Sequence, residues 1–264
     1  MRDLELLWPG SAKFIGAVSV CALLAGCGQG GQDAGEASAP ADDAPAMAED
    51  VAEDQAPEAE PTPEEILGEV LAGDWRTEDA ARDEWRNPKE TLEFLGLEPG
   101  MTVVEIWPGG GWYTKVIAPY LARTGGAYIA AGFDPASESE FVQNALARYR
   151  ETYIERPELY GDIQLAALSA DSGPIADPGT VDMIVTFRNV HNWMAGGFAE
   201  KAYADFYAAL KPGGVLGVVE HRASDGAEQD PAAANGYVRQ DYVIAQAEAA
   251  GFEYVGGSVQ TPNG

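Results

Sequence analysis

Two histidines are the side chains of this chain best suited to proton transfer near neutral pH. His191 and His221 are the only histidines among 264 residues, and each lies at or just after the end of an apolar, strand-like run. An imidazole has a pKa that small shifts bring across neutrality, so either ring could remove a proton from a bound substrate. We take His191 as the first candidate for such a base and His221, which follows Glu220, as the second. The alternative is that each histidine only bonds backbone carbonyls at the sheet edge.

A glycine-rich turn is the second feature that could bind a ligand. The run Met101–Ile106 is apolar on both faces, which predicts a buried central strand. The turn 107–111, with the sequence Trp-Pro-Gly-Gly-Gly, follows at once, and a helix is predicted over residues 112–121. A strand, a glycine turn and a helix amino end together place bare backbone N–H groups where a ligand can approach closely.

The elements that must position these residues alternate between helix and strand periods through residues 64–264. This alternation predicts a parallel sheet with helices on both faces. Strands are predicted at 101–106, 127–133, 163–169, 181–187, 215–219 and 252–259, and helices at 64–72, 77–95 with a break at Asn87-Pro88, 112–121, 144–153 and 237–250. Ligands of open α/β sheets lie outside the carboxyl ends of the strands, where both histidines and the glycine turn are predicted.

The sequence resembles the class I S-adenosylmethionine (SAM)-dependent methyltransferases. Their first motif is an acidic residue, a variable residue and then three glycines at alternate positions. Glu105, Gly109 and Gly111 match this motif, and Trp107 occupies the position of the first glycine. The Leu-Lys-Pro-Gly-Gly turn at 210–214, just before a predicted strand, is a second signature of the family. The resemblance implies a Rossmann-like, doubly wound, mostly parallel α/β sheet with SAM as the cofactor.

The resemblance also implies which residues bind this cofactor. The glycine turn would pass beside the amino acid part of SAM, Asp134 would accept the ribose hydroxyls, and Asp171 would lie near the adenine amine. The alternative for each aspartate is that it only starts or caps a turn. The expected cofactor-binding residues are Glu105, Gly109, Gly110, Gly111, Asp134, Asp171 and Arg188.

Methyl transfer from a sulfonium is an in-line displacement, so the protein chiefly positions the acceptor and removes a proton from it. The expected catalytic residues are therefore His191, Asn192 and His221, with Trp193 as a further orienting or stacking group. No metal is predicted, because the histidines and Glu220 lack a matched ligand spacing. In the family two strands normally follow the fifth. Only 252–259 is predicted here, so we expect a sheet without the last antiparallel strand.

Within the family, the chain is similar to a group of predicted secreted methyltransferases. The shared features are the Trp-Pro-Gly-Gly-Gly-Trp-Tyr turn, the Arg-Asn-Val-His-Asn-Trp segment that begins at Arg188, and the Glu-His-Arg strand end that begins at Glu220. This group implies a location outside the cytoplasm, but it implies no particular acceptor.

The amino-terminal residues predict such an export. The uncharged run 14–25 is too short to span a bilayer but suits the core of a secretory signal. It ends on Leu-Ala-Gly-Cys, which resembles the bacterial lipobox and implies cleavage before Cys27 and attachment of lipid to its thiol. Residues 1–26 are thus predicted to be a lipoprotein signal peptide, the alternative being a signal that merely contains cysteines. Acyl chains on Cys27 would hold the protein at a membrane, and Gly28 after it favours the outer membrane, facing the periplasm.

Residues 27–63 are predicted to be a disordered acidic tether before the domain at 64–264. The carboxylates from Asp33 to Glu60 meet no Lys or Arg, and the stretch cannot bury enough apolar surface to offset its ordering entropy. The formal charge of −27 argues against nucleic acid as a partner.

Two functional hypotheses of different classes follow. One is an envelope-tethered methyltransferase acting on a small molecule or a cell-envelope component. The other is a catalytically silent Rossmann-like ligand-binding lipoprotein. A nicotinamide-dependent oxidoreductase is a weaker third, because the glycine spacing and the Lys-Pro-Gly-Gly turn suit methyltransferases better.

Overall fold

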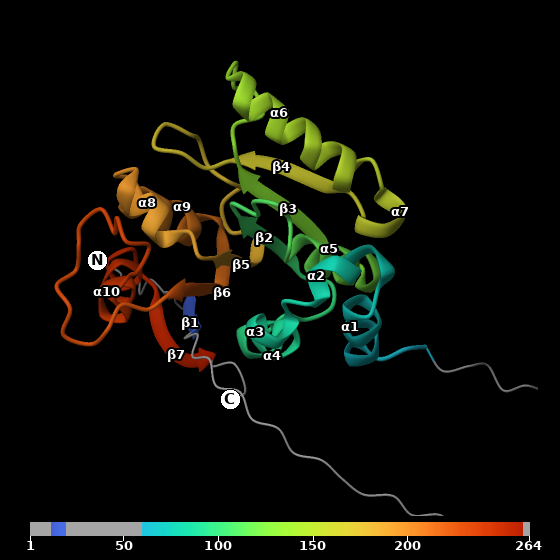
Figure 1. Cartoon of the computed structure of the whole chain (residues 1–264), viewed down its shortest axis with the longest axis horizontal. Coiled ribbons are helices and arrows are strands. Elements are labelled where there is room, and N and C mark those ends of the chain that lie inside the picture. The colour runs from blue at the N-terminus through green and yellow to red at the C-terminus, as the bar shows by residue number, and fades with distance from the viewer. Residues whose placement is uncertain (1–11, 20–59, 261–264) are drawn as a thin grey trace, which may run out of the picture. The chain divides into compact units, whose positions relative to one another are not determined.

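The computed structural model describes residues 12–19 and 60–260 (Figure 1). The described residues 12–19 and 62–260 belong to one compact unit. The predicted lipidation site Cys27 and almost all of the predicted tether lie outside the described residues. Within the described part of the chain, no helix has the length and apolar character needed to cross a membrane.

Seven strands form a single sheet in the order β4-β3-β2-β5-β6-β1-β7, and all of the strand pairs that the structure describes are parallel (Figure 1). The strands are β1 (Lys13–Ser19), β2 (Thr102–Ile106), β3 (Ala127–Gly132), β4 (Ile163–Ala167), β5 (Val181–Phe187), β6 (Leu210–His221) and β7 (Glu253–Gln260). The predicted Rossmann-like parallel sheet is confirmed, and six of these strands lie where the apolar runs predicted them. Apolar runs of this length are typical of strands buried on both faces.

Helices cover both faces of the sheet. They are α1 (Pro63–Leu71), the short 3₁₀ helix η1 (Asp74–Arg76), α2 (Thr77–Ala80), α3 (Asp83–Arg86), α4 (Pro88–Leu95), α5 (Thr114–Thr124), α6 (Glu140–Tyr149), the π-helical turn η2 (Arg150–Ile154), α7 (Pro157–Tyr160), α8 (Val190–Ala195), α9 (Ala199–Ala209) and α10 (Gln240–Ala249). The predicted break after α3 is present, because Asn87 takes a left-handed φ of 40° before Pro88 begins the next helix.

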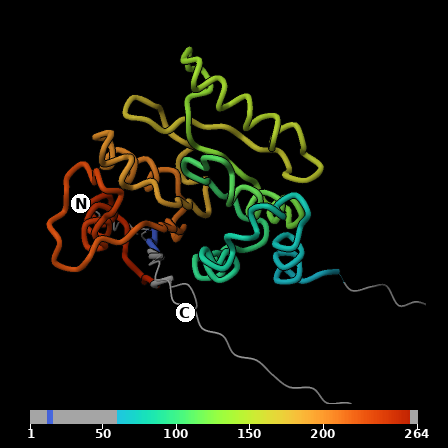
Figure 2. Tube along the Cα trace, in the orientation of Figure 1, coloured from blue at the N-terminus to red at the C-terminus, as the bar shows by residue number. Residues whose placement is uncertain are grey.

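Two hydrophobic cores result from this double covering. Val104 and Ile106 of β2 pack with helices α8, α9 and α10, whereas Val103 of the same strand packs with α1, α4 and α5. The two groups of helices can be followed in Figure 2, the first in orange to red and the second in cyan to green. Successive residues of a strand point to opposite faces, so one apolar strand serves both cores and is fixed between them.

The Leu-Lys-Pro-Gly-Gly segment lies within β6 rather than before it. Val181 pairs with Leu210, but Met183 already pairs with Val215, so the intervening residues form an irregularity in the strand. Gly213 takes a φ of 80°, which side chains rarely adopt. The predicted turn is therefore an interruption of the ladder, after which β6 continues to His221 at the edge that carries the site.

Strand β1 is the one strand that the sequence analysis did not predict. Lys13–Ser19 belongs to the predicted signal peptide, yet it pairs with β6 on one side and with β7 on the other. Phe14 is 1% exposed and contacts the ring of Tyr254 at 5.7 Å between centroids. The domain therefore includes a segment ahead of residue 64, and the sheet gains a parallel strand between β6 and β7. An uncharged apolar run suits both a secretory signal and a buried strand, so its pattern does not distinguish them.

Candidate functional site

A cavity of about 660 Å³ lies at the carboxyl ends of β2, β5 and β6. Six of the predicted site residues line it, namely Glu105, Gly109, Gly110, Arg188, His191 and His221. A neighbouring cavity of about 180 Å³ shares Trp107, Pro108, Gly109 and Asn189 with it. Apolar side chains from around the ends of β3 and β4, among them Phe133 and Leu165, line this second cavity. The sheet thus brings the glycine turn and both histidines to one place, as the sequence predicts.

The glycine turn keeps a regular backbone pattern although Trp107 replaces a glycine. Trp107, Gly109 and Gly111 have φ values of 49°, 60° and 77°, so all three alternate positions are left-handed. Such a φ is uncommon for a bulky residue and persists only where the surroundings hold it. The indole Nε1 of Trp107 donates to the carbonyl of Leu168 at 3.1 Å, and its ring contacts Phe133 and Phe198. The side chain thereby anchors the turn between the two cavities.

Gly111 does not line either cavity, but it sets the path of the turn. A Cβ on Gly111 would lie 2.2 Å from the hydroxyl oxygen of Tyr153, well inside any real contact. That hydroxyl donates to the carbonyl of Gly110 at 2.6 Å. At Gly109 and Gly110, in contrast, an added Cβ meets no atom within 4 Å. The turn is therefore backed by Tyr153 on one side and open at Gly109 and Gly110.

Glu105 at the end of β2 is a buried carboxyl group that joins three elements. It is 2% exposed and accepts hydrogen bonds from the hydroxyls of Thr114, at 3.0 Å, and of Tyr128. Burial raises the pKa of Glu105 to about 7, against the lowering effect of these two hydrogen bonds. Glu105 thus ties the sheet to the first turn of α5, directly behind the glycine turn.

This raised pKa predicts a pH-dependent stability. The pKa of Glu105 is about 7 when folded against 4.5 as its ordinary value, so the folded state binds more protons between these values. The free energy of unfolding should therefore fall as pH rises from 4.5 to 7, by about 3 kcal/mol from this group, with the full loss above pH 7. Glu105→Gln removes the titration. Urea unfolding at several pH values should show a smaller fall for the variant, and parallel curves for both proteins would contradict this assignment.

His191 and Glu220 form the polar centre of the cavity. The Nδ1 atom of His191 lies 3.2 Å from both carboxylate oxygens of Glu220, which is 4% exposed. The same carboxylate accepts from the backbone N–H groups of Val190 and His221, both at 2.8 Å. Glu220 thereby fixes the ring, and Nε2 has no protein hydrogen-bond partner among the described residues. This is the arrangement that a general base needs, because one nitrogen is oriented and the other is left for a substrate.

His221 lies at the same edge of the sheet. Its ring contacts that of Tyr237 at 5.5 Å between centroids. Burial lowers the pKa of His221, and the positive charge of Arg188 lowers it further. Glu220 does not orient the ring of His221, because its carboxylate accepts from the backbone N–H of that residue. His221 therefore stays the second candidate for the base.

Besides Gly111, four predicted residues line neither cavity. Asp134 is exposed and its carboxylate accepts from the backbone N–H of Ala136 at 2.8 Å, which is the geometry of a turn starter. Asp171 is exposed in a turn, and Asn192 lines neither cavity. Trp193 is fully buried against Tyr203 and Phe206, so it is a core residue and the predicted stacking role is wrong. The periodicity of the sequence does not show whether a side chain near the end of a strand points into the core or into a cavity.

The structure adds lining residues that the sequence analysis missed. Asn189 is 8% exposed, lines both cavities and donates to the carbonyl of Ile106 at 2.9 Å, which joins the ends of β2 and β5. Arg82 and Arg86 reach the larger cavity from the segment of short helices before α4. Asn189 belongs to the Arg-Asn-Val-His-Asn-Trp segment, in which the sequence analysis considered His191 as the base. Arg82 and Arg86 have no sequence signal beyond their charge.

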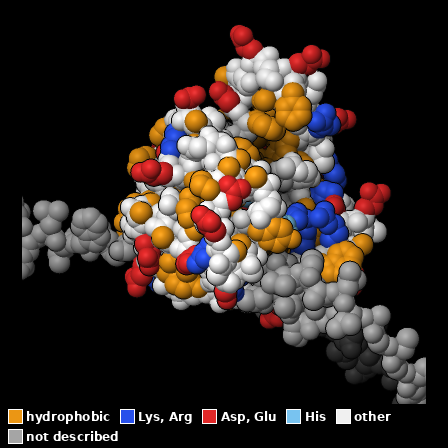
Figure 3. Space-filling view, turned by 60° about the vertical axis from the view of Figure 1, so that its left-hand side comes forward, with side chains coloured by type: hydrophobic (Ala, Val, Ile, Leu, Met, Phe, Trp, Pro, Cys, Tyr) orange, Lys and Arg blue, Asp and Glu red, His pale blue; other side chains and the backbone are white. Residues whose placement is uncertain are grey.

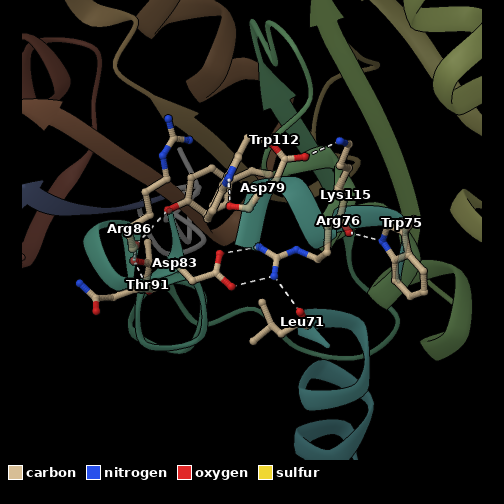
Figure 4. A network of polar contacts seen from close by, with 11 residues as sticks. Leu71, Trp75, Arg76, Asp79, Asp83, Arg86, Thr91, Trp112 and Lys115 are labelled. Atoms are coloured by element: carbon tan, nitrogen blue, oxygen red, sulfur yellow. Dashed lines mark hydrogen bonds and ion pairs between the residues drawn. The ribbon is translucent and has the colours of Figure 1, made fainter. Parts of the chain in front are cut away.

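A polar network holds the segment of Arg82 and Arg86 in place (Figure 4). The fully buried guanidinium of Arg76 bonds both carboxylate oxygens of Asp83, at 2.7 and 2.6 Å, and the carbonyl of Leu71 at 2.7 Å. The indole of Trp112, next to the glycine turn, donates to the carbonyl of Asp79 at 3.1 Å. These bonds dock the short helices onto the start of α5, so their arginines have a defined position beside the turn.

The chain was compared with known proteins. No protein-family model matches it. It is 26% identical over 135 residues to the ubiquinone/menaquinone biosynthesis C-methyltransferase UbiE of Hydrogenovibrio crunogenus. That match covers 50% of this chain and 46% of the relative, so the chain spans about half the length of the curated relative it matches.

Two solved structures are also similar. A SAM-dependent methyltransferase from Aquifex aeolicus is 20% identical with a TM-score of 0.47, over 70% of this chain and 87% of that one. A possible exported protein from Bordetella parapertussis is 20% identical with a TM-score of 0.43, over 66% of this chain and 61% of that one. The sheet topology and the glycine turn, together with the match to UbiE, give this chain the fold of the class I SAM-dependent methyltransferases.

Proposed function

We propose that the chain is a SAM-dependent methyltransferase whose cofactor lies along the glycine turn. The observation that carries this proposal is the turn itself, left-handed at three alternate positions and open at Gly109 and Gly110, where it borders both cavities. Backbone without side chains can approach the amino acid part of SAM, and the apolar second cavity suits its nucleoside. The residues present therefore fit this cofactor.

His191 is proposed to act as the base that accepts the proton of the methyl acceptor. When SAM is bound, its sulfonium supplies an activated methyl group. Nε2 of His191 would receive the proton, and Glu220, held by two backbone N–H groups, would stabilise the resulting imidazolium. Asn189 would keep the ends of β2 and β5 in register around the two cavities. The protein's main contribution is then positioning, as an in-line displacement requires.

Attachment to the cell envelope belongs to the same proposal. The run 14–25 followed by Leu-Ala-Gly-Cys supports lipidation at Cys27, and the acceptor would be a small molecule or an envelope component. The residue after Cys27 favours the outer membrane, with the domain facing the periplasm. Metabolic labelling with a fatty acid, in the intact chain and in Cys27→Ala, tests this part. Label that persists in the variant would refute it.

A calorimetric titration of SAM and S-adenosylhomocysteine into the purified chain tests the cofactor assignment. We expect micromolar binding of both compounds. A folded protein that binds neither would overturn the proposal. Binding of both without any methyl transfer to envelope or small-molecule extracts would favour the silent ligand-binding lipoprotein.

Replacing the proposed base should separate binding from transfer. In His191→Ala we expect the Kd of SAM to change less than about twofold and the transfer of label from methyl-labelled SAM to fall about 100-fold, the usual scale for loss of a general base. Transfer into envelope and small-molecule extracts is the measurement. Lys201→Ala, on the surface of α9 and paired with Asp205, is the control and should behave like the natural chain. Full activity in His191→Ala would remove His191 as the base.

A further inference from the structure

Three arginines line the larger cavity in a chain whose formal charge is −27. They are Arg82, Arg86 and Arg188, and none of them forms an ion pair with another described residue. On the face seen in Figure 3, acidic side chains in red are spread over the surface, and the largest group of basic side chains in blue lies at the right, with smaller blue patches elsewhere. A group of arginines that no described carboxylate pairs is suited to binding an anionic ligand.

The three arginines line the same cavity, and two of them have a marked local geometry. The guanidinium of Arg86 lies over the ring of Trp112 at 4.5 Å from its centroid, and Figure 4 shows it pointing away from the Arg76–Asp83 pair. Burial, together with repulsion from Arg188 and Arg82, lowers the pKa of Arg86 to about 10. Arg188 itself has a left-handed φ of 62°, a strained conformation of the kind that clusters at ligand sites.

The carboxylates around the cavity are already engaged. Asp79 is ion-paired with Lys115, and Glu220 is bonded to His191 and to backbone N–H groups. Glu105 accepts from two hydroxyls behind the glycine turn, and its raised pKa keeps part of it neutral at pH 7. Protein groups therefore do not neutralise the three arginines within the described part of the chain.

The proposed cofactor does not neutralise them either. SAM has one carboxylate, one ammonium and one sulfonium, so it carries a net positive charge at neutral pH. Its carboxylate could match one guanidinium, and two would still be unpaired beside a cation. We propose that the methyl acceptor carries an oxyanion, a carboxylate or a phosphate, which the cluster of Arg82, Arg86 and Arg188 binds in the larger cavity.

This inference rests on the proposed function and adds a substrate class to it. A guanidinium presents a planar fork of N–H donors that bonds an oxyanion through two parallel hydrogen bonds. The stacking of Arg86 on Trp112 restricts the fork before the ligand arrives, which lowers the entropy lost on binding. His191 lines the same cavity, so an acceptor anchored by the arginines would present its nucleophile near Nε2.

Binding of inorganic phosphate and of benzoate to the intact chain tests the inference, with the change of tryptophan fluorescence as the signal because Arg86 lies over Trp112. We expect millimolar binding that persists when the protein is saturated with S-adenosylhomocysteine. Arg86→Gln and Arg188→Gln should each weaken it at least tenfold. Arg123→Gln, which loses a surface arginine paired with Glu69, should not. Preference for phosphate or for benzoate indicates which oxyanion the acceptor carries.

Each outcome bears on one proposal. Binding of the anion that S-adenosylhomocysteine abolishes would mean that the arginines serve the cofactor carboxylate, and it would overturn the inference. Equal binding by Arg86→Gln, Arg188→Gln and the natural chain would overturn it as well. S-adenosylhomocysteine binding without any anion binding would reject the inference alone, whereas arginine-dependent anion binding without cofactor binding would reject the proposed methyltransferase. Thermal melting of each variant identifies those that have lost the fold, and Arg188→Lys then keeps the charge while removing the planar fork.

Discussion

Replacing Gly111 with aspartate is expected to abolish SAM binding, raising its Kd at least 100-fold. Gly111 has a φ of 77°, and any Cβ there would lie 2.2 Å from the hydroxyl of Tyr153. Tyr153 is buried and its hydroxyl also bonds the carbonyl of Gly110, so either the ring or the turn must move and the contact that backs the turn is lost. The cofactor is proposed to approach the backbone at Gly109 and Gly110, so a displaced turn removes the surface it would use.

Calorimetry measures this effect, and the control is the same substitution elsewhere. Gly68→Asp places an aspartate on the exposed side of α1, where a Cβ meets nothing within 4 Å. It should bind SAM as the natural chain does. Gly111→Ala, which adds no charge, should also lose most of the binding if the collision with Tyr153 is the cause. Unchanged affinity in Gly111→Asp, with a normal melting temperature, would show that the cofactor does not depend on the turn.

The sheet could be predicted because buried parallel strands have short apolar runs as their sequence pattern, with turn residues between them. Val181–Phe187 has the predicted bounds, and 252–259 differs from Glu253–Gln260 by a single residue at each end. Helix α9 escaped prediction because its apolar residues are mostly alanines and tyrosines, a weak stripe that nevertheless packs Tyr203 and Phe206 into a core. Burial in the assembled molecule decides such a helix more than its own sequence does.

The parts of the site that depend on the backbone path could be predicted from the sequence. The contacts between side chains that are distant in sequence could not. The strand-end histidines and the glycine turn follow from the topology of an open α/β sheet. The contact of Arg86 with Trp112 joins residues 26 positions apart through short helices that have little pattern of their own. For Asp134 the sequence left two roles open, ribose binding and turn formation, and the structure shows the contact of the turn, with the backbone N–H of Ala136.

Strand β1 raises the sharpest conflict between sequence and structure. If residues 1–26 are removed as a signal peptide, the mature chain loses a strand that lies between β6 and β7. The facing edges of these strands would then carry unpaired backbone N–H and C=O groups, and the core would lose Phe14. The predicted export signal and the sheet thus share the same few residues.

Substituting Phe14 in the intact chain should reveal whether β1 supports the fold. Phe14 is 1% exposed, so Phe14→Ala should lower the free energy of unfolding by about 3–5 kcal/mol, measured by urea denaturation. Lys13→Ala, one position away in the same strand and exposed, should change it by less than about 0.5 kcal/mol. Equal stability of both variants would mean that β1 does not contribute to the folded state in solution.

A chain that begins at Cys27 completes the test, because it is the predicted mature form. If β1 belongs to the working fold, this chain should melt at least 10 °C below the intact one, the scale expected when several kcal/mol are lost from a domain of this size. A mature chain as stable as the intact one, together with a neutral Phe14→Ala, would assign residues 13–19 to export alone. A large loss in both would mean that an exported protein must close the gap between β6 and β7 with another strand, so the envelope proposal would then require a partner that supplies one.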